Sequence, residues 1–394
     1  MGGCGRKPFS ISSSRLRGTP AVRFRRLLGC LALALFFRST LADPALGLPL
    51  VSAPAGQNAA QVELGRKLFM DRRLSSNGTM SCGMCHIPEQ GFAANEMATA
   101  IGLRGRSLRR NAPTLLNVVF QRTLFHDGRS DTLENQVWGP LLADDEMGNR
   151  TRSAVVARLS TLPDYAAPFE RAFPREGVTE QTIAAALASY ERTLIAADTR
   201  FDRWLLGGEA SALSAVERAG FDLFTGKAGC SVCHTVGADS ALFTDHAFHN
   251  SGIGWLRANA HDRRVSVPLG GGETAEVSAA EMTALFGGGA RDEGRFEVTH
   301  EPSDRWAYKT PSLRNVALTA PYMHDGSLAT LSDVIDFYDR GGIDNPGKDP
   351  LLRRLHLTVA EKQQLAAFLL SLTSDQARQL AAQARAAFHS RQSD

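Results

Sequence analysis

Apolar residues recur every three or four positions in several stretches of the chain. The clearest stretch is 182–196, and shorter ones are 331–338 and 357–372. Amphipathic helices show this spacing, whereas half-buried strands alternate apolar and polar residues, and none of these stretches alternates in that way. Glycine-rich and charged segments separate the stretches. The pattern predicts an all-α fold.

An internal repeat divides the chain in two. Residues 112–118 recur as 310–316, and residues 125–128 recur as 323–326. Both pairs share one offset of 198 residues. Because several motifs recur at a constant offset, we expect two homologous domains.

Each repeat contains one Cys-x-x-Cys-His motif, at 82–86 and at 230–234, and an apolar helix pattern precedes both. The motifs are only 148 residues apart, so the second copy carries about 50 additional residues. We place this insertion roughly within 254–305, a stretch rich in glycine and charge.

The motif itself is the attachment signature of c-type haem. Two thiols one helical turn apart reach the two vinyl groups of a porphyrin, and the histidine after them ligates the iron. A zinc site or a redox dithiol explains the pattern less well, because zinc needs four ligands and a dithiol needs no following histidine. We therefore expect two covalent haems, attached through Cys82, Cys85 and His86 and through Cys230, Cys233 and His234.

The repeat also predicts what lies opposite each iron-ligating histidine. Pro140 stands fourteen positions after His126, and Tyr338 stands fourteen positions after His324. Proline offers iron no ligand, whereas tyrosine can ligate it as phenolate. The first haem is thus expected to be open and the second to be six-coordinate. The alternative for Tyr338 is an aromatic side chain on the core side of a helix.

The composition, 43% hydrophobic and 22% charged, is that of a globular protein and excludes collagen, coiled-coil and disordered classes. Residues 1–42 hold eight basic residues and no acidic one, with an apolar run at 27–37 that is too short to span a bilayer. They predict a cleaved secretory signal. The remaining chain has 36 basic and 41 acidic residues, which argues against nucleic acid as a partner. We expect an exported, soluble, periplasmic protein without a membrane span.

Five segments together carry a resemblance to a known family: 64–86, 110–118, 125–129, 136–148 and 309–331. They are similar to the bacterial dihaem cytochrome c peroxidases, and within these to the MauG-like branch. The resemblance implies two cytochrome-c-like domains related by a pseudo-twofold axis, a first haem that reacts with peroxide and a second that stores and relays electrons. The domains expected are 43–210 and 211–378, followed by a tail at 379–394.

The resemblance also implies roles for individual residues at the first haem. Gln136 and Glu146 match the polar pair on its peroxide-binding face, with Pro140 between them. A carboxylate there can move a proton from the near oxygen of peroxide to the departing one. Without the family, Glu146 would belong to a run of three acids, which usually marks a solvated surface.

A calcium ion between the domains is implied as well. The side chain of Asn111 and the backbone carbonyls of Thr319 and Pro321 match its ligands. Ligand sets made only of oxygen suit Ca²⁺.

Three positions depart from ordinary members of the family. Leu103 replaces a histidine that caps the first iron, Tyr338 replaces a methionine ligand as it does in MauG, and His126 replaces a tryptophan between the haems. Leu103 implies a first haem that is open without prior reduction. A hard anionic ligand such as tyrosine favours oxidised iron. His126 leaves the aromatic relay unassigned, and the candidates in its place are Trp138, Trp306 and Tyr322.

The resulting expectation is a MauG-like enzyme that uses H₂O₂ to form a high-valent dihaem state and oxidises Trp or Tyr of a partner protein. MauG reaches its partner through a tryptophan at the position of Ala228, so a different partner is expected. MbnH-like enzymes of copper-peptide systems offer a second identity within the branch. One alternative is a peroxidase fed by a small cytochrome c, against which Tyr338 and Leu103 count. The other is a non-catalytic dihaem electron carrier, for which Pro140 and Glu146 would have no purpose.

Overall fold

The computed structural model describes residues 1, 45–50, 57–259, 264–270, 273–278 and 292–389. The signal segment predicted at 1–42 lies outside these residues except for Met1. Residues Ala42–Asp394 form one compact unit. Its described helices are α1 Ala59–Met70, α2 Cys82–Cys85, α3 Leu133–Gln136, α4 Trp138–Leu142, α5 Arg152–Ser160, α6 Pro163–Ala172, α7 Glu180–Glu191, α8 Arg200–Leu205, α9 Ala215–Thr225, α10 Ile253–Ala258, α12 Phe296–Thr299, α13 Leu331–Asp339, α14 Val359–Ser371 and α15 Asp375–His389. The strands are β1 Phe248–His249, β2 Arg264–Gly270, β3 Glu273–Ser278 and β4 Tyr308–Lys309.

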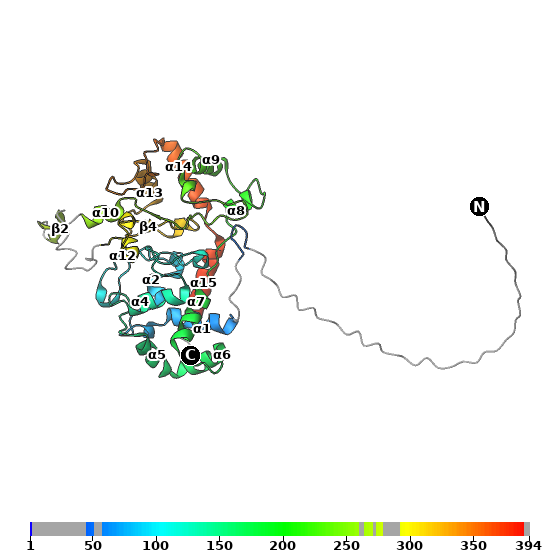
Figure 1. Cartoon of the computed structure of the whole chain (residues 1–394), viewed down its shortest axis with the longest axis vertical. Helices are drawn as coiled ribbons and strands as arrows, with labels where there is room; N and C mark the ends of the chain where they lie inside the picture. Colours follow the sequence, from blue (N-terminus) through cyan, green and yellow to red (C-terminus); the bar gives the residue numbers. More distant parts are fainter. Residues whose placement is uncertain (2–44, 51–56, 260–263, 271–272, 279–291, 390–394) are drawn as a thin grey trace. The chain divides into compact units, whose positions relative to one another are not determined.

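The prediction of an all-α fold is confirmed, since the described chain folds mainly into helices joined by loops (Figure 1). Helix α7 ends five residues before the apolar pattern does. The reason is Asn117, whose backbone N–H donates to the Leu194 carbonyl at 2.7 Å and whose Oδ1 accepts from the Ala196 N–H at 2.9 Å. These bonds hold the chain in an extended course past the end of the helix.

A close helix crossing lies at the centre of each domain, α1 with α7 in the first and α9 with α14 in the second. Glycine permits both crossings. A Cβ added at Gly65 would lie 1.9 Å from the Ala186 carbonyl oxygen, and one at Gly220 would lie 2.0 Å from that of Gln364. The two domains therefore share the same way of packing their first and last helices.

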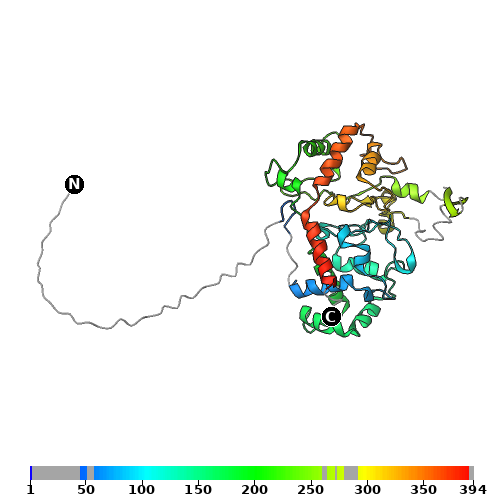
Figure 2. The ribbon, with the colours of Figure 1, turned by 180° about the vertical axis from the view of Figure 1, so that it is seen from behind.

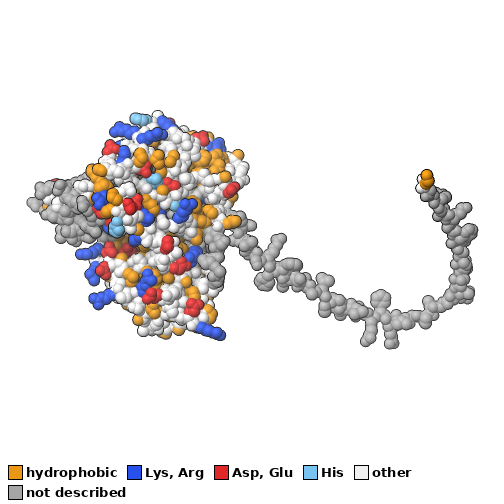
Figure 3. All heavy atoms as spheres, in the orientation of Figure 1, with side chains coloured by type: hydrophobic (Ala, Val, Ile, Leu, Met, Phe, Trp, Pro, Cys, Tyr) orange, Lys and Arg blue, Asp and Glu red, His pale blue; other side chains and the backbone are white. Residues whose placement is uncertain are grey.

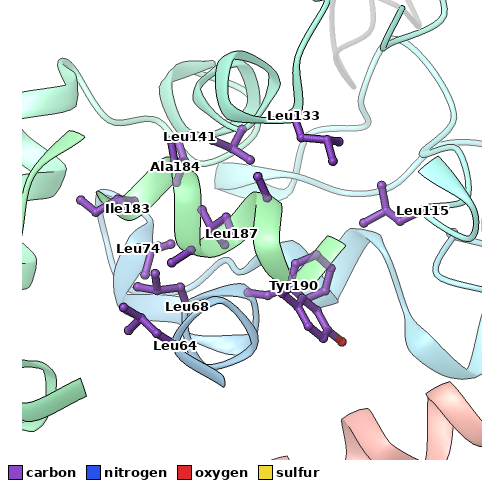
Figure 4. Packing of buried hydrophobic residues seen from close by; sticks show 14 of the residues in the cluster. Leu64, Leu68, Leu74, Leu115, Leu133, Leu141, Ile183, Ala184, Leu187 and Tyr190 are labelled. Atoms are coloured by element: carbon purple, nitrogen blue, oxygen red, sulfur yellow. The ribbon is translucent and has the colours of Figure 1, made fainter. Parts of the chain in front are cut away.

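The core of the first domain fills the space around its crossing. Figure 4 shows Leu64 and Leu68 of α1 close to Ile183 and Leu187 of α7, and all four side chains are buried. Burying an aliphatic side chain of this size contributes about 1.5–3 kcal/mol. The crossing thus gives a rigid support to the first motif, which follows α1 after residues 71–81.

The two domains repeat each other in detail. Asn117 and Asn315, which are 198 residues apart, both adopt the left-handed backbone conformation, with φ of 61° and 60°. Each donates its N–H to the chain beyond its domain's last core helix, Asn117 to Leu194 and Asn315 to Leu372. The match in backbone geometry agrees with the repeat in the sequence.

Two hydrogen bonds join the domains symmetrically. The Asn111 N–H donates to the His324 carbonyl at 2.7 Å, and the Lys309 N–H donates to the His126 carbonyl at 2.8 Å. Asn111 matches Lys309, and His126 matches His324, at the repeat offset of 198 residues. The two bonds are therefore equivalent under a pseudo-twofold relation between the domains.

The described residues also contain two small two-stranded antiparallel sheets, which the helix-and-loop prediction did not include. Strand β1 pairs with β4, and β2 pairs with β3 as a hairpin. The hairpin lies in the predicted insertion, where Val265, Val267 and Leu269 alternate with other residues, a strand signal that the prediction did not use. Elsewhere in the insertion, Arg295 donates from Nη1 to the Asp127 carbonyl of the first domain at 2.8 Å. This part of the insertion therefore contacts the first domain.

Residues 379–389 were predicted to be part of a tail, but they form most of α15. Figures 1 and 2 both show this helix beside the first domain. Its Ala377 and Ala384 are buried in the core of that domain, and Arg385 Nε lies 2.8 Å from Glu89 Oε1. The chain therefore returns from the second domain to cover the first.

Acidic and basic side chains are interspersed over the face shown in Figure 3. Within the described part of the chain, every helix is too short or too polar to cross a membrane.

Candidate active site

The first Cys-x-x-Cys-His motif consists of α2 and its C-terminal cap. Cys82 and Cys85 occupy the two ends of α2, and the His86 N–H donates to the Cys82 carbonyl at 2.9 Å. The His86 Nδ1 lies 3.2 Å from the Phe92 carbonyl. Because a carbonyl only accepts, Nδ1 carries the proton and Nε2 keeps a lone pair for a metal. Burial also lowers the pKa of His86, which favours the neutral ring.

The second motif repeats this arrangement. Its His234 N–H donates to the Cys230 carbonyl at 2.9 Å, and Nδ1 donates to the Phe243 carbonyl at 2.9 Å. Phe92 and Phe243 both have positive φ, 55° and 52°, a strain of roughly 1–3 kcal/mol for a bulky residue. The same strain in both copies orients a carbonyl toward each histidine. Both histidines are thus prepared as neutral Nε2 ligands.

A cavity lies against the first motif, and it fits a haem. Cys82, Cys85 and His86 border it, and none of the four motif cysteines is in a disulfide. Burial raises the pKa of the Cys85 thiol to about 11, so the thiol is neutral. The apolar residues of the wall are Phe69, Met80, Leu115, Val137 and Met147. An apolar cavity with two thiols and a prepared histidine suits a covalently attached porphyrin.

The residues expected on the peroxide-binding face line the same cavity. Gln136 is the last residue of α3, Pro140 lies in α4, and Glu146 lies in the turn after α4. The turn folds back on the helix, because the Met147 N–H donates to the Pro140 carbonyl at 3.2 Å. The structure therefore brings these three residues together with the first motif.

Glu146 is electrostatically distinct from the neighbouring acids. Burial and, to a smaller extent, the negative charge of Asp145 raise its pKa to about 7, against the opposing charge of Arg129. A carboxyl with such a pKa can both accept and donate a proton near neutral pH. The run of three acids at 144–146 is therefore not simply a solvated surface.

Leu103 lies beside this turn. Its N–H is 3.0 Å from the Asp145 carbonyl and 3.1 Å from that of Glu146, and its side chain is buried in the first core. Leu103 is not among the residues that line the cavity. Position 103 thus supplies no ligand in this structure.

Tyr338 lies on α13 near the second motif. Burial and, to a smaller extent, the nearby Cys233 and Cys230 raise the pKa of its phenol to about 12. A raised pKa favours the protonated phenol, whereas a bound cation would favour the phenolate. Its matched position in the first domain is Pro140, so the two sites differ in the group available to an iron.

His126 contacts both domains, through Asn111 of the first and Lys309 of the second. Its Nε2 lies 3.0 Å from the Asn111 carbonyl, and its own carbonyl accepts from the Lys309 N–H at 2.8 Å. Burial lowers the pKa of His126 to about 4, so the ring is neutral and donates from Nε2. Beside it, Tyr308 and His324 stack with ring centroids 3.5 Å apart and an interplanar angle of 10°. No pattern in the sequence predicted this stack.

The other aromatic candidates have different surroundings. Trp138 is buried in the first core, and the buried Trp306 Nε1 has no hydrogen-bond partner. The Tyr322 hydroxyl donates to the Val316 carbonyl at 3.1 Å within the second domain.

The three residues expected to bind calcium lie near the contact between the domains. Asn111 donates from Nδ2 to the Ala98 carbonyl at 2.9 Å, which leaves Oδ1 as the acceptor of the amide. Thr319 and Pro321 belong to the loop that reaches Asn111 at His324. Oδ1 of the amide and the two backbone carbonyls are oxygen ligands of the kind that Ca²⁺ uses.

Two groups at the motifs were missed in the sequence. Glu191 lines the first cavity and is buried, and its spacing from Ile183 and Leu187 on α7 is the helical signal that could have revealed it. At the second motif, His249 lies between Asp245 and Asp349, with nitrogen to oxygen distances of 2.9 and 2.5 Å. No spacing in the sequence connects these three residues.

Comparison with known proteins identifies the family. A family model described as di-haem cytochrome c peroxidase matches residues 59–210. The methylamine utilization protein MauG of Methylorubrum extorquens is 37% identical over 318 residues, which cover 80% of this chain and 79% of the relative. The chain belongs to the di-haem cytochrome c peroxidase family. Another family member, the cytochrome-c peroxidase IdrP1 of Denitromonas iodatirespirans, is 37% identical over 336 residues, or 84% of this chain and 86% of the relative.

Solved structures agree with this family. A MauG-like protein associated with microbial copper homeostasis superposes with a TM-score of 0.69 at 33% identity, covering 85% of this chain and 96% of that one. The diheme peroxidase BthA from Burkholderia thailandensis gives 0.64 at 26% identity, covering 85% and 92%. As a member of this family, the protein is a haem-dependent oxidoreductase with two haems.

Proposed function

We propose that this di-haem peroxidase is a MauG-like enzyme. It reacts with H₂O₂ at the haem of His86, shares the two oxidising equivalents with a second haem held by His234 and Tyr338, and oxidises a Trp or Tyr residue of a partner protein. The observation that carries the proposal is the difference between matched positions. Pro140 lines the cavity of the first motif, whereas Tyr338 lies beside the second.

Both haems are covalently attached through the motif cysteines in this proposal, and a calcium ion lies between the domains on Asn111, Thr319 and Pro321. When bound, the haems supply the iron centres that take up peroxide and hold oxidising equivalents. The chain fixes their histidine ligands through the carbonyls of Phe92 and Phe243. Such outer hydrogen bonds set the ring orientation and the basicity of a ligating histidine.

The chemistry of the chain at the first site is proton transfer. Glu146 takes the proton from the near oxygen of peroxide and returns it to the departing oxygen, which then leaves as water. Gln136 lines the same wall and offers an amide for hydrogen bonds to peroxide. Pro140 keeps the position open because it has no group that ligates iron.

The contact between the domains supports sharing of oxidising equivalents. His126 forms hydrogen bonds to Asn111 on one side and Lys309 on the other, and these residues lie two positions before Pro113 and Pro311. The backbones of Pro113 and Pro311 lie close to the rings of His86 and His234, respectively. Through His126, a path of covalent and hydrogen bonds therefore leads from the backbone beside one iron-ligating histidine to the backbone beside the other.

We place the enzyme in the periplasm, where the signal segment would send it and where covalent haem attachment is expected. A second candidate function, reduction of H₂O₂ with electrons from a small cytochrome c, is favoured by the relatives named cytochrome c peroxidase. Tyr338 counts against it, because a phenolate stabilises oxidised iron and opposes the reduced state that a cytochrome donor must produce.

The test uses the fully ferric protein, a tryptophan-containing reporter protein and, separately, a reduced small c-type cytochrome. The wild type should oxidise the reporter after addition of H₂O₂, as measured by mass spectrometry. Tyr338→Met should keep both haems and lose this oxidation, and the control Tyr165→Phe, a tyrosine substitution in the first core that does not line the cavity, should retain it. Oxidation of the cytochrome with no modification of the reporter would favour the second function instead.

A further inference from the structure

Glu191 is a buried carboxyl of the first haem cavity that proton transfer by Glu146 does not use. Its side chain is at the C-terminal end of α7, and the residue is 5% exposed. The Oε2 atom has no hydrogen-bond partner. Glu191 lines the cavity together with Gln136 and Glu146. A buried polar atom without a partner is costly, and it needs a functional or structural explanation.

Arg192, the residue after Glu191, forms an ion pair that is in contact with solvent. Arg192 Nη2 lies 2.7 Å from Glu134 Oε1, and the Glu134 side chain is 37% exposed. Glu134 and Gln136 both belong to α3, the short helix that contributes to the cavity wall. A charged pair in contact with water therefore adjoins the elements that hold the buried carboxyl.

The overall reaction needs protons that Glu146 does not supply. Reduction of H₂O₂ to two molecules of water breaks the O–O bond and consumes two electrons and two protons. The electrons come from the protein or cytochrome that is oxidised. Glu146 only moves a proton from one oxygen of peroxide to the other, so both net protons have to enter from solvent.

We propose that Glu191 is the proton-entry residue of the first haem cavity, which takes up protons beside the Glu134–Arg192 pair and donates them to the cavity. This inference rests on the proposed reaction with peroxide and adds a second acid to it. Glu146 acts when the O–O bond breaks, and Glu191 acts when the remaining oxygen is converted to water.

The charges around Glu191 support a protonated resting state. Burial is the main cause that raises its pKa, Arg192 opposes the shift and Glu134 adds to it, and together they bring the pKa to about 8. The Cys82 sulfur also lies near Glu191, and it carries no charge once it is bonded to a porphyrin. Glu191 therefore holds a proton at neutral pH and loses it as the pH rises past about 8.

The decisive variant is Glu191→Gln, studied in the holoenzyme with ferrocyanide as a donor that supplies electrons and no protons. Cleavage of peroxide, followed by stopped-flow absorbance of the first haem, should stay at the wild-type rate. Steady-state turnover should fall by about 10²-fold, a typical loss when an acid is removed. In the wild type, turnover should fall as the pH rises past about 8, and the variant should lack this step.

Infrared spectroscopy gives a readout that is independent of turnover. The resting wild type should show a protonated-carboxyl band that disappears as the pH rises past about 8, and Glu191→Gln should lack it. Glu180→Gln, a partly exposed substitution at the other end of the same helix, is the matched control and should leave the band and turnover unchanged. Glu191→Asp, which keeps a carboxyl, should retain more turnover than the glutamine variant.

Wild-type turnover and pH dependence in Glu191→Gln would overturn the inference. So would a loss of peroxide cleavage equal to the loss of turnover, because that result would assign Glu191 to the first step or to the structure of the site. If the variant does not bind haem, absence of the titrating band in the wild type overturns it. Failure of the wild type to react with H₂O₂ would instead contradict the proposed function.

Discussion

Glu146→Gln tests the proton transfer at the first haem. The substitution keeps the size and polarity of the side chain and removes its ability to take a proton. We expect the rate of peroxide cleavage to fall by about 10²–10⁴, which corresponds to about 3–5 kcal/mol in the activation barrier. Binding of haem should be unchanged, because Glu146 belongs to a turn and not to the motif.

The pH dependence gives the sharper form of this prediction. The base form of Glu146 is the one that accepts a proton from peroxide, so the wild-type rate should rise with pH and reach half its maximum near pH 7. The glutamine variant should lack this step. Asp145→Asn is the matched control: it removes a charge that raises the pKa of Glu146, so its midpoint should move to lower pH while the maximal rate is kept.

The assay is stopped-flow absorbance of the ferric holoenzyme mixed with excess H₂O₂ at a series of pH values, with haem content measured for each variant. The second-order rate constant at each pH gives the profile. A glutamine variant that retains both the wild-type rate and its midpoint would refute the role of Glu146, and the proton would have to move through another group in the cavity.

Two further predictions concern cofactor content and stability. Replacing Cys82 and Cys85 together by serine should remove one of the two haems, as counted by the pyridine haemochrome assay; two remaining haems, or bound zinc in the wild type, would contradict covalent attachment. Asp292→Asn should lower the free energy of unfolding by about 3 kcal/mol in urea titrations, because it breaks a buried pair with Arg110 whose oxygen and nitrogen are 2.7 Å apart. Glu293 forms a half-exposed pair with Arg305, and Glu293→Gln should lower the free energy of unfolding by no more than about 1 kcal/mol.

The sequence predicted the helices and the repeat well because both depend on local patterns. Helix α14 matches the predicted stretch 357–372 to within two residues at each end. The reciprocal bonds of His126 and His324 follow the offset of 198 residues that the motifs predicted. Helix α7 was predicted too long, because the apolar spacing continues while Asn117 draws the chain out of the helix.

Features that depend on distant contacts were not visible in the sequence. Nothing in the sequence shows that Phe92 and Phe243 present their carbonyls to the histidines, since this depends on strained backbone angles. Nor does the composition of α15 indicate that it packs on the first domain rather than the second. Glu191 was overlooked for a different reason: a lone acid near the end of a helix usually lies in solvent.

The spin states of the fully ferric holoenzyme test the central claim most directly, because that claim is the difference between Pro140 and Tyr338. Electron paramagnetic resonance, recorded before any reductant is added, should show one high-spin haem and one low-spin haem. The same sample should then react with H₂O₂ at once. Two low-spin haems, with a reaction only after one electron has been added, would contradict the account and show that another residue caps the first iron.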